Sequence, residues 1–129
     1  MEEIFKKYPL LKLKNVPRET FIQFEIFVSM LQQRNEEINI ISKETAKNEV
    51  IRERHIVDSA QIIEFIDLNS NIITDIGSGG GMPGIIISIM IKNQKNLAKV
   101  HLYEKSHHKS SFLRKVSRDL KLNTEVMQE

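Results

Sequence analysis

The chain has 129 residues, with 19 lysines and arginines against 17 aspartates and glutamates, which gives a formal net charge of +2. This length fits one compact domain, and so small a net charge does not by itself indicate a nucleic-acid partner. The absence of cysteine excludes disulfides, thiolate zinc sites and a cysteine nucleophile. The N-terminus lacks the apolar run of a signal peptide, and no apolar stretch approaches the roughly 20 residues that cross a bilayer. We therefore expect a cytoplasmic protein without a membrane contact.

Residues 1–68 are predicted to form an N-terminal helical region. After a short amphipathic start over residues 1–16, Asn15 and Pro17 are typical of a helix entrance, because the first turn does not need the N–H that proline lacks. Apolar residues then recur on one helix face, at Phe21, Phe24, Phe27 or Val28, and Leu31. A second helical region is predicted to bend or break near residues 53–55, with a buried stripe of Ala46, Val50, Ile51, Val57, Ala60, Ile63 and Ile66.

Residues 69–129 are predicted to form an α/β domain of alternating strands and helices. A β-branched run over 71–76 predicts a buried strand, residues 85–93 a helix packed on both sides, and residues 98–104 a second strand. Residues 106–122 predict a second helix and residues 123–129 a third strand, with a helical apolar stripe of Phe112, Leu113, Val116 and Leu120. This alternation indicates a parallel sheet with right-handed crossovers, which binds ligands at the carboxyl ends of its strands.

All five glycines of the chain lie between Gly77 and Gly84, in the stretch DIGSGGGMPG. One glycine is enough for a tight turn, whereas five indicate a backbone that adopts positive φ angles and comes close to a ligand. A phosphate-binding P-loop is excluded, because Ile85 and Ile86 stand where that motif needs a lysine and a hydroxyl residue.

A dinucleotide site is one interpretation of this loop. Gly79, Gly81 and Gly84 satisfy the G-x-G-x-x-G spacing, and Glu104 follows twenty residues later, where a ribose-binding acid is expected. Pro83 counts against this interpretation, because it removes one of the helix-terminal N–H groups that bind a pyrophosphate.

The alternative ligand is S-adenosylmethionine, which has the opposite electrostatics. Asp75 would repel a pyrophosphate, but it attracts the sulfonium and ammonium groups of the methyl donor, while Glu104 can accept hydrogen bonds from both ribose hydroxyls. The pattern of Asp75, Gly77, Gly79 and Gly81, followed by Glu104, therefore favours S-adenosylmethionine. A dinucleotide-dependent oxidoreductase is kept as the alternative.

Four blocks of sequence resemble the bacterial ribosomal RNA small-subunit methyltransferase G family, also called glucose-inhibited division protein B. Residues 77–84 match its G-[ST]-G-x-G-x-P-G loop, residues 35–42 its N-x-x-x-N-L-[ST] segment, and residues 54–59 its R-H-[IL]-x-D-S segment. Residues 104–114 resemble the segment in which an acid precedes a basic helix ending in F-L-R. The chain departs from the family in having no tryptophan near residues 35–39 and in carrying Ile40 in place of leucine.

The resemblance implies transfer of a methyl group from S-adenosylmethionine to N7 of a guanine in small-subunit (16S) ribosomal RNA. It places cofactor contacts on Gly77 and Met82 and the ribose acid on Glu104. Guanine N7 carries no proton, so we expect no catalytic acid or base, and we expect no metal. The implied partner is small-subunit ribosomal RNA or the subunit particle, bound by a monomer.

Contacts with the RNA are predicted at Arg54, His55, Lys109 and Arg114. Each has a plain structural alternative: His55 capped by Asp58 at a helix break, and a basic helix face that is only solvated. The adjacent pair His107 and His108 is interpreted as a solvated helix start rather than a metal site.

The family continues beyond a third strand, so the resemblance implies that residues 69–129 are the first half of a Rossmann-like S-adenosylmethionine-dependent methyltransferase domain. The chain would then be a fragment or a truncated gene product. A three-stranded sheet would leave an edge and apolar surface uncovered, and we expect marginal stability and no activity for the chain alone. An RNA- or ribosome-binding module without catalysis is the non-enzymatic alternative.

Overall fold

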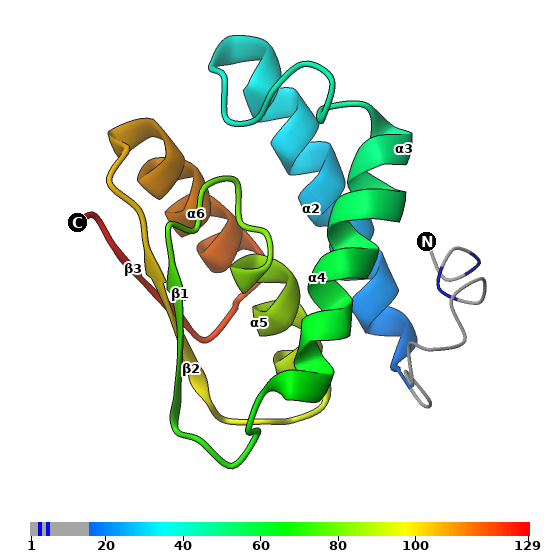
Figure 1. Cartoon of the computed structure of the whole chain (residues 1–129), viewed down its shortest axis with the longest axis vertical. Coiled ribbons are helices and arrows are strands. Elements are labelled where there is room, and N and C mark those ends of the chain that lie inside the picture. The colour runs from blue at the N-terminus through cyan, green and yellow to red at the C-terminus, as the bar shows by residue number, and fades with distance from the viewer. Residues whose placement is uncertain (1–2, 4, 6–15) are drawn as a thin grey trace.

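The computed structural model describes residues 3, 5 and 16–129, and its elements follow the predicted order of helices and then an alternating α/β segment (Figure 1). The predicted start over residues 1–16 lies largely outside the described residues. The helical part comprises α2 (Arg18–Glu37), α3 (Asn48–Val50), a π-helical turn (Ile51–Ile56), α4 (Val57–Gln61) and a 3-10 helix (Ile62–Phe65). The α/β part comprises β1 (Ile72–Ile76), α5 (Gly84–Asn93), β2 (Lys99–Tyr103), α6 (His107–Asp119) and β3 (Thr124–Met127).

Helix α2 confirms the predicted apolar face. Phe24, Phe27, Val28 and Leu31 are buried, as their spacing along one helix face requires. Pro17 is the N-cap residue rather than a residue of the first turn, and its carbonyl accepts a hydrogen bond from the Thr20 N–H at 3.0 Å.

The second helical region was predicted to bend or break, and at this place the structure has the π-helical turn Ile51–Ile56. This turn connects α3 directly to α4, so the backbone stays helical throughout. A wider turn of this kind shifts the side chains relative to a regular α-helix. Ile51, Ile56, Val57 and Ala60 are nevertheless all directed into the core. The predicted bend near residues 53–55 therefore corresponds to a local change in helix type.

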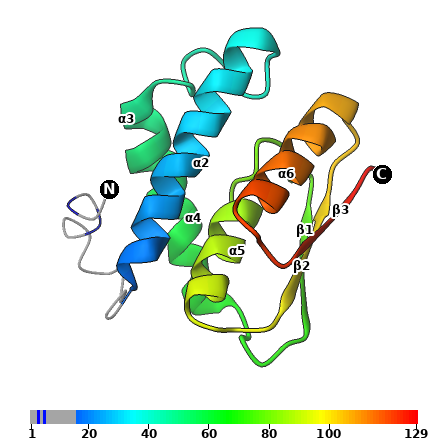
Figure 2. The same cartoon turned by 180° about the vertical axis from the view of Figure 1, so that it is seen from behind.

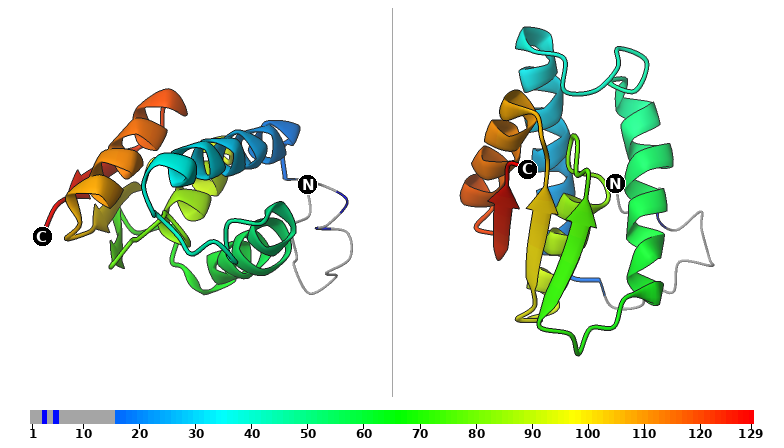
Figure 3. Two further views of the ribbon diagram at one scale, coloured as in Figure 1. Left: turned by 90° about the horizontal axis from the view of Figure 1, so that it is seen from above. Right: turned by 60° about the vertical axis from the view of Figure 1, so that its left-hand side comes forward.

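The three strands form a parallel sheet in the order β1-β2-β3, as predicted. Helices α5 and α6 lie against one face of this sheet, and α2 packs on these two helices, which is visible from behind in Figure 2 and from the strand side in Figure 3 (right). The register pairs Ile76 with Tyr103 and Tyr103 with Met127, so the strands end together at one edge of the fold.

Strand β1 is less buried than the sequence suggested. Residues 71–76 were predicted as a buried strand, but Ile72 is 54% and Ile76 is 76% exposed. The reason is that β1 is an edge strand and that these two residues point away from the helices. By contrast, Val100 and Leu102 on the central strand are fully buried beneath the helices.

Helix α5 is enclosed on all sides, as its continuous apolar sequence predicted. Every residue from Gly84 to Ile91 is buried, because α5 packs against α2 and α4 as well as against β2. The helical part and the sheet therefore share one hydrophobic core, and the division of the chain at residue 68 stays a proposal. Within the described part of the chain, no helix is both long and apolar enough to cross a membrane.

Candidate cofactor site

The glycine-rich segment forms the loop between β1 and α5, at the carboxyl end of the sheet (Figure 3, right). Its first two amides, those of Gly77 and Ser78, both donate to the carbonyl oxygen of Tyr103 at 2.9 Å. These bonds tie the loop to the end of β2. Residues that follow the first two strands are thereby brought together, as the alternation of strands and helices predicted.

The glycines serve two different purposes. Gly77 has φ +73°, and a Cβ placed on it would meet no atom within 4 Å, so this part of the loop faces open space. Gly80 and Gly84 face inward instead: a Cβ on Gly80 would lie 2.9 Å from Cγ2 of Ile41, and one on Gly84 would lie 2.5 Å from Oδ2 of Asp75. Open space above Gly77 is what a bound ligand needs, whereas the inward glycines allow close packing.

Asp75 lies at the end of β1, half-buried, and its Oδ2 accepts a hydrogen bond from the Gly84 N–H at 3.2 Å. Burial raises the pKa of the Asp75 carboxyl above its usual value, and hydrogen bonds from Ser78 and Gly84 oppose this shift in part. The Asp75 carboxylate is therefore poorly solvated. A nearby cation would stabilise its charged form.

Glu104 lies directly after β2, and its carboxylate is held in place by two backbone amides. Oε1 accepts from the Gly79 N–H at 2.9 Å, and Oε2 accepts from the Ser106 N–H at 2.7 Å. The sequence placed Glu104 near the loop but did not indicate this bond across it. Because each carboxylate oxygen can accept two hydrogen bonds, Glu104 retains capacity for a ligand hydroxyl.

The first two amides of α5 are already used within the protein. The Gly84 N–H bonds to Asp75, the Ile85 N–H donates to the Gly81 carbonyl at 2.7 Å, and the residue between Met82 and Gly84 is a proline. A pyrophosphate at a helix N-terminus depends on such amides being free. This hydrogen bonding argues against a dinucleotide.

Two of the predicted cofactor contacts are less open than Gly77. Gly81 is buried, and its N–H donates to the Ser78 carbonyl at 2.9 Å. Met82 is half-buried against the core and is joined to Pro83 by a cis peptide bond. The contacts assigned to Gly81 and Met82 stay predictions.

The four residues predicted to contact RNA are spread over two separate elements. Lys109 lies in the first turn of α6, and Arg114 further along α6 places Nη2 3.4 Å from the carbonyl oxygen of Val126 in β3. Arg54 and His55 lie in the π-helical turn, with Arg54 exposed and His55 half-buried.

The expected cap of His55 by Asp58 is not formed. Among the described residues, no hydrogen bond or ion pair joins these two side chains, and Asp58 is exposed. Instead, the Ser59 hydroxyl donates a hydrogen bond to the backbone carbonyl oxygen of His55 at 2.5 Å, within the same helical segment.

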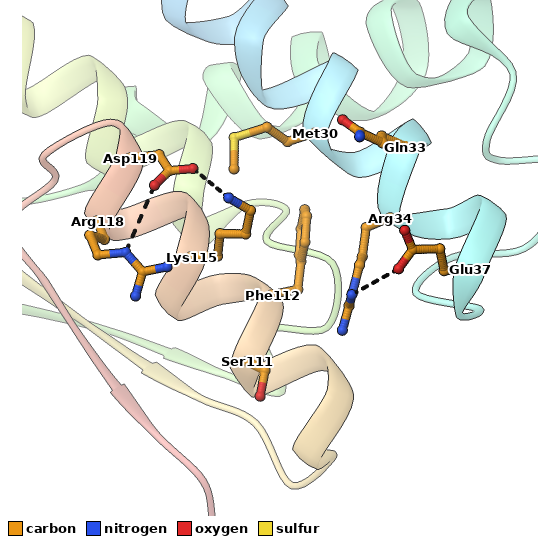
Figure 4. A pocket seen from close by; sticks show the side chains of 9 residues that line it. All are labelled: Met30, Gln33, Arg34, Glu37, Ser111, Phe112, Lys115, Arg118 and Asp119. Atoms are coloured by element: carbon orange, nitrogen blue, oxygen red, sulfur yellow. Dashed lines mark hydrogen bonds and ion pairs between the residues drawn. The ribbon is translucent and has the colours of Figure 1, made fainter.

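A separate groove of about 520 Å³ lies between α2 and α6 and was not predicted (Figure 4). Its charged groups pair with one another, Arg34 with Glu37 at 3.1 Å and Lys115 with Asp119 at 2.8 Å. Exposed pairs of this kind contribute little to stability. None of the residues lining the groove belongs to the glycine loop.

Within the described part of the chain, no three histidine or acidic side chains are grouped as metal ligands. His107 and His108 are exposed at the start of α6, in the position predicted for them.

A parallel sheet with a glycine loop after its first strand and an acid after its second is the arrangement of Rossmann-like nucleotide-binding folds, and it is consistent with a Rossmann-like methyltransferase. The family model of rRNA small subunit methyltransferase G (GidB) matches residues 21–129. The chain therefore belongs to the rRNA small subunit methyltransferase G family.

Individual relatives agree with this assignment. Over its whole length the chain is 91% identical to the ribosomal RNA small subunit methyltransferase G of Pelagibacter ubique (strain HTCC1062), and it covers 61% of that protein. It is 37% identical to the protein of the same name from Rickettsia rickettsii (strain Iowa), with 91% of this chain and 57% of that protein covered. For the Cereibacter sphaeroides protein (strain ATCC 17029 / ATH 2.4.9) the identity is 34%, with 88% of this chain and 54% of that protein covered. The chain thus spans less than two thirds of the length of these relatives.

Proposed function

We propose that this chain carries the S-adenosylmethionine-binding part of an enzyme that methylates N7 of a guanine in small-subunit (16S) ribosomal RNA. The observation that carries this proposal is the pair of carboxylates at the loop, Asp75 and Glu104, combined with the engagement of the first two amides of α5, those of Gly84 and Ile85, within the protein. A site with half-buried negative charge favours a cationic nucleoside over a pyrophosphate.

The residues of the site have distinct roles in this proposal. Gly77 and Gly79 leave room for the nucleoside, and the Glu104 carboxylate accepts hydrogen bonds from the ribose hydroxyls. Asp75 interacts with positive charge at the end of β1, where its own desolvation would be relieved. Gly81 and Met82 complete the set of proposed contacts.

S-adenosylmethionine supplies an electrophilic methyl group on a sulfonium when it is bound. Guanine N7 has a lone pair in the ring plane and no proton, so no side chain is required to remove one. The contribution of the protein is then to align the acceptor nitrogen with the methyl group and to exclude water from the charged centre. Arg54, His55, Lys109 and Arg114 are proposed to hold the RNA for this alignment.

Equilibrium binding tests the cofactor assignment. We expect the chain to bind S-adenosylhomocysteine with micromolar affinity in a calorimetric titration and to show no heat of binding with NAD. Binding of NAD without binding of S-adenosylhomocysteine would contradict the proposal and favour the oxidoreductase alternative.

Methyl transfer is tested separately, with tritiated S-adenosylmethionine and unmodified small-subunit ribosomal RNA. Because the chain spans about three fifths of the Pelagibacter ubique relative, the assay is carried out on this chain and on that full-length protein in parallel. Label at guanine N7 with the full-length protein supports the proposed reaction. RNA binding without label in either protein would favour a binding module that lacks catalysis.

A further inference from the structure

The connection between α2 and α3, residues 38–47, is packed against the inner side of the glycine loop. The Asn35 side chain fixes its first part, since Oδ1 accepts the N–H groups of Ile40 at 2.8 Å and Ile41 at 2.9 Å. Ile41 in turn lies so close to Gly80 that a Cβ there would be 2.9 Å from its Cγ2. The connection therefore has a defined position beside the candidate cofactor site, at the carboxyl end of the sheet (Figure 3, right).

A cavity of about 330 Å³ lies where this connection meets the first turn of α6. Its lining comprises Asn39, Ile40, Ile41, Ser42, Lys43 and Lys109. The two lysines come from elements far apart in sequence, and no carboxylate lines the cavity. Lys115, one turn and a half further along α6, is by contrast paired with Asp119 at 2.8 Å.

Two lysines at one cavity concentrate positive charge there, and a bound anion would offset this charge. Among the described residues, no acidic side chain is within ion-pair distance of Lys43 or Lys109, so this part of the chain does not supply that anion. Ser42 and Asn39 add polar groups to the same lining. This combination is suited to a phosphate group, because the lysine ammonium group binds phosphate as a compact point charge.

The cavity is separate from the space proposed for the cofactor. Gly77 faces open space on one side of the loop, whereas Gly80 faces Ile40 and Ile41, whose side chains lie between the loop and the cavity. Gly77 is not among the residues that line the cavity, so the cavity is not part of the space above Gly77. A strand of RNA that crosses the carboxyl end of the sheet carries a phosphate at every nucleotide.

We propose that Lys43 and Lys109 form a subsite for one backbone phosphate of the RNA whose guanine is methylated. This inference rests on the proposed function and adds to it a second element, the connection after α2, as part of the RNA-binding surface. The subsite positions the RNA and takes no part in the chemistry of methyl transfer.

The salt dependence of RNA binding tests the subsite. The probe is an unmodified single-stranded fragment of small-subunit ribosomal RNA. Its dissociation constant is measured by fluorescence anisotropy over a series of salt concentrations, at a temperature below the melting transition of the chain. One phosphate contact contributes about 0.7 to the slope of log affinity against log salt for a single strand. We expect Lys43→Gln and Lys109→Gln each to reduce the slope by about this amount or less, because both lysines contact the same phosphate.

Matched variants separate this effect from a general loss of charge. Lys95→Gln and Lys121→Gln remove the same charge near a different cavity, at the ends of α5 and α6, and should leave the slope close to that of the unaltered chain. Lys43→Arg and Lys109→Arg keep the charge and should keep most of the slope. Thermal melting followed by circular dichroism checks that each variant is folded.

Each outcome of the titration decides the question. A reduced slope with unchanged S-adenosylhomocysteine affinity supports the subsite. An unchanged slope, an equal reduction in the Lys95 and Lys121 variants, or no RNA binding by the unaltered chain contradicts it. Weaker S-adenosylhomocysteine binding by Lys43→Gln or Lys109→Gln would also contradict it and assign the lysines to the cofactor. Failure of the unaltered chain to bind S-adenosylhomocysteine is a separate result, which removes the proposed function itself.

Discussion

At the scale of single residues, Asp75 shows a conflict between folding and binding. Its carboxyl pKa is raised because burial disfavours the charged form. A raised native pKa means that the protonated acid favours the folded state below the pKa of the unfolded chain, and that this contribution is lost as pH rises through the native pKa. At neutral pH the charged Asp75 therefore lowers the stability of the native fold, which is consistent with a residue retained for a ligand.

We predict that Asp75→Asn weakens binding of S-adenosylmethionine while leaving the folded state as stable or more stable at neutral pH. The asparagine oxygen can still accept from the Gly84 N–H, but the attraction for a cation is lost. A hydrogen-bonded charge contributes about 1.5–3 kcal/mol, so the affinity should fall at least about tenfold in a calorimetric titration.

The pH dependence of stability provides an independent check on Asp75. The free energy of unfolding of Asp75→Asn, minus that of the unaltered chain, should grow as pH rises through the native pKa of Asp75. Urea titrations at several acidic pH values measure this difference. A difference that stays constant or shrinks with rising pH would show that Asp75 is not destabilised by burial.

Two glycine substitutions should distinguish a glycine that is needed for core packing from one that is needed to leave room for the ligand. In Gly84→Ala the new Cβ meets Leu102 and the Asp75 carboxylate, and overpacking of this kind costs about 1–3 kcal/mol. In Gly77→Ala the Cβ meets no protein atom, so only the positive φ is unfavourable, at about 1–2 kcal/mol, and the methyl group enters the proposed nucleoside space. Chemical denaturation and S-adenosylhomocysteine binding of the two variants measure these effects.

The informative result is the comparison of the two variants. Gly77→Ala should lose ligand affinity under conditions in which it is still folded, whereas Gly84→Ala should lose stability first. Normal ligand binding by Gly77→Ala would place the cofactor elsewhere.

At the scale of elements, α5 and α6 end in the same way, with a lysine in a left-handed conformation. Lys95 has φ +59° and Lys121 has φ +54°, directly after the helix C-cap. The Asn96 and Leu122 amides then bond back to Ile91 and Ser117 at 2.9 Å, which is the Schellman pattern of helix termination. Glycine is the usual residue at this position, because a Cβ is unfavourable in the left-handed region.

We therefore predict that Lys121→Gly stabilises the chain by about 0.5–1 kcal/mol. This figure is the strain relieved at the left-handed position, less the cost of the greater backbone entropy of glycine in the unfolded chain. Thermal or urea unfolding measures the change. The matched control is Lys115→Gly in the interior of α6, which should destabilise by about 1 kcal/mol. Destabilisation by both substitutions would mean that the Lys121 side chain makes a contribution larger than its backbone strain.

At the scale of the whole molecule, the helices of the described residues cover one face of the sheet and leave the other open (Figure 3, right). Ile72 and Ile76 point to the open face, while Phe65 in the 3-10 helix and Leu97 just before β2 are 86% and 90% exposed. Apolar surface left in contact with water contributes nothing to folding, and an unpaired edge strand favours association.

We predict that this chain alone is only marginally stable, with a melting transition near room temperature when followed by circular dichroism. Ile76→Thr should leave the transition almost unchanged, whereas Ile89→Thr, at a fully buried position of α5, should abolish it. A sharp, cooperative transition well above room temperature in the unaltered chain would contradict the first part of this prediction.

The sequence by itself determined the order of the elements, the parallel sheet, most buried helix positions and the location of the candidate site. These features depend on periodicity and on glycine and proline, which act through the local backbone and are readable without neighbours. The family resemblance was confirmed by the family model and by the relatives. It could be recognised from the sequence because its motifs, residues 35–42, 54–59, 77–84 and 104–114, are short continuous segments.

Only the tertiary structure decided which glycines face a ligand and which face the core, because that depends on atoms brought from Ile41 and Leu102, far away in sequence. It alone showed that Glu104 closes the loop through the Gly79 amide and that the Gly84 and Ile85 amides at the start of α5 are already bonded. It also corrected the burial of β1, since whether a β-branched strand is central or at an edge is set by its partners rather than by its own residues.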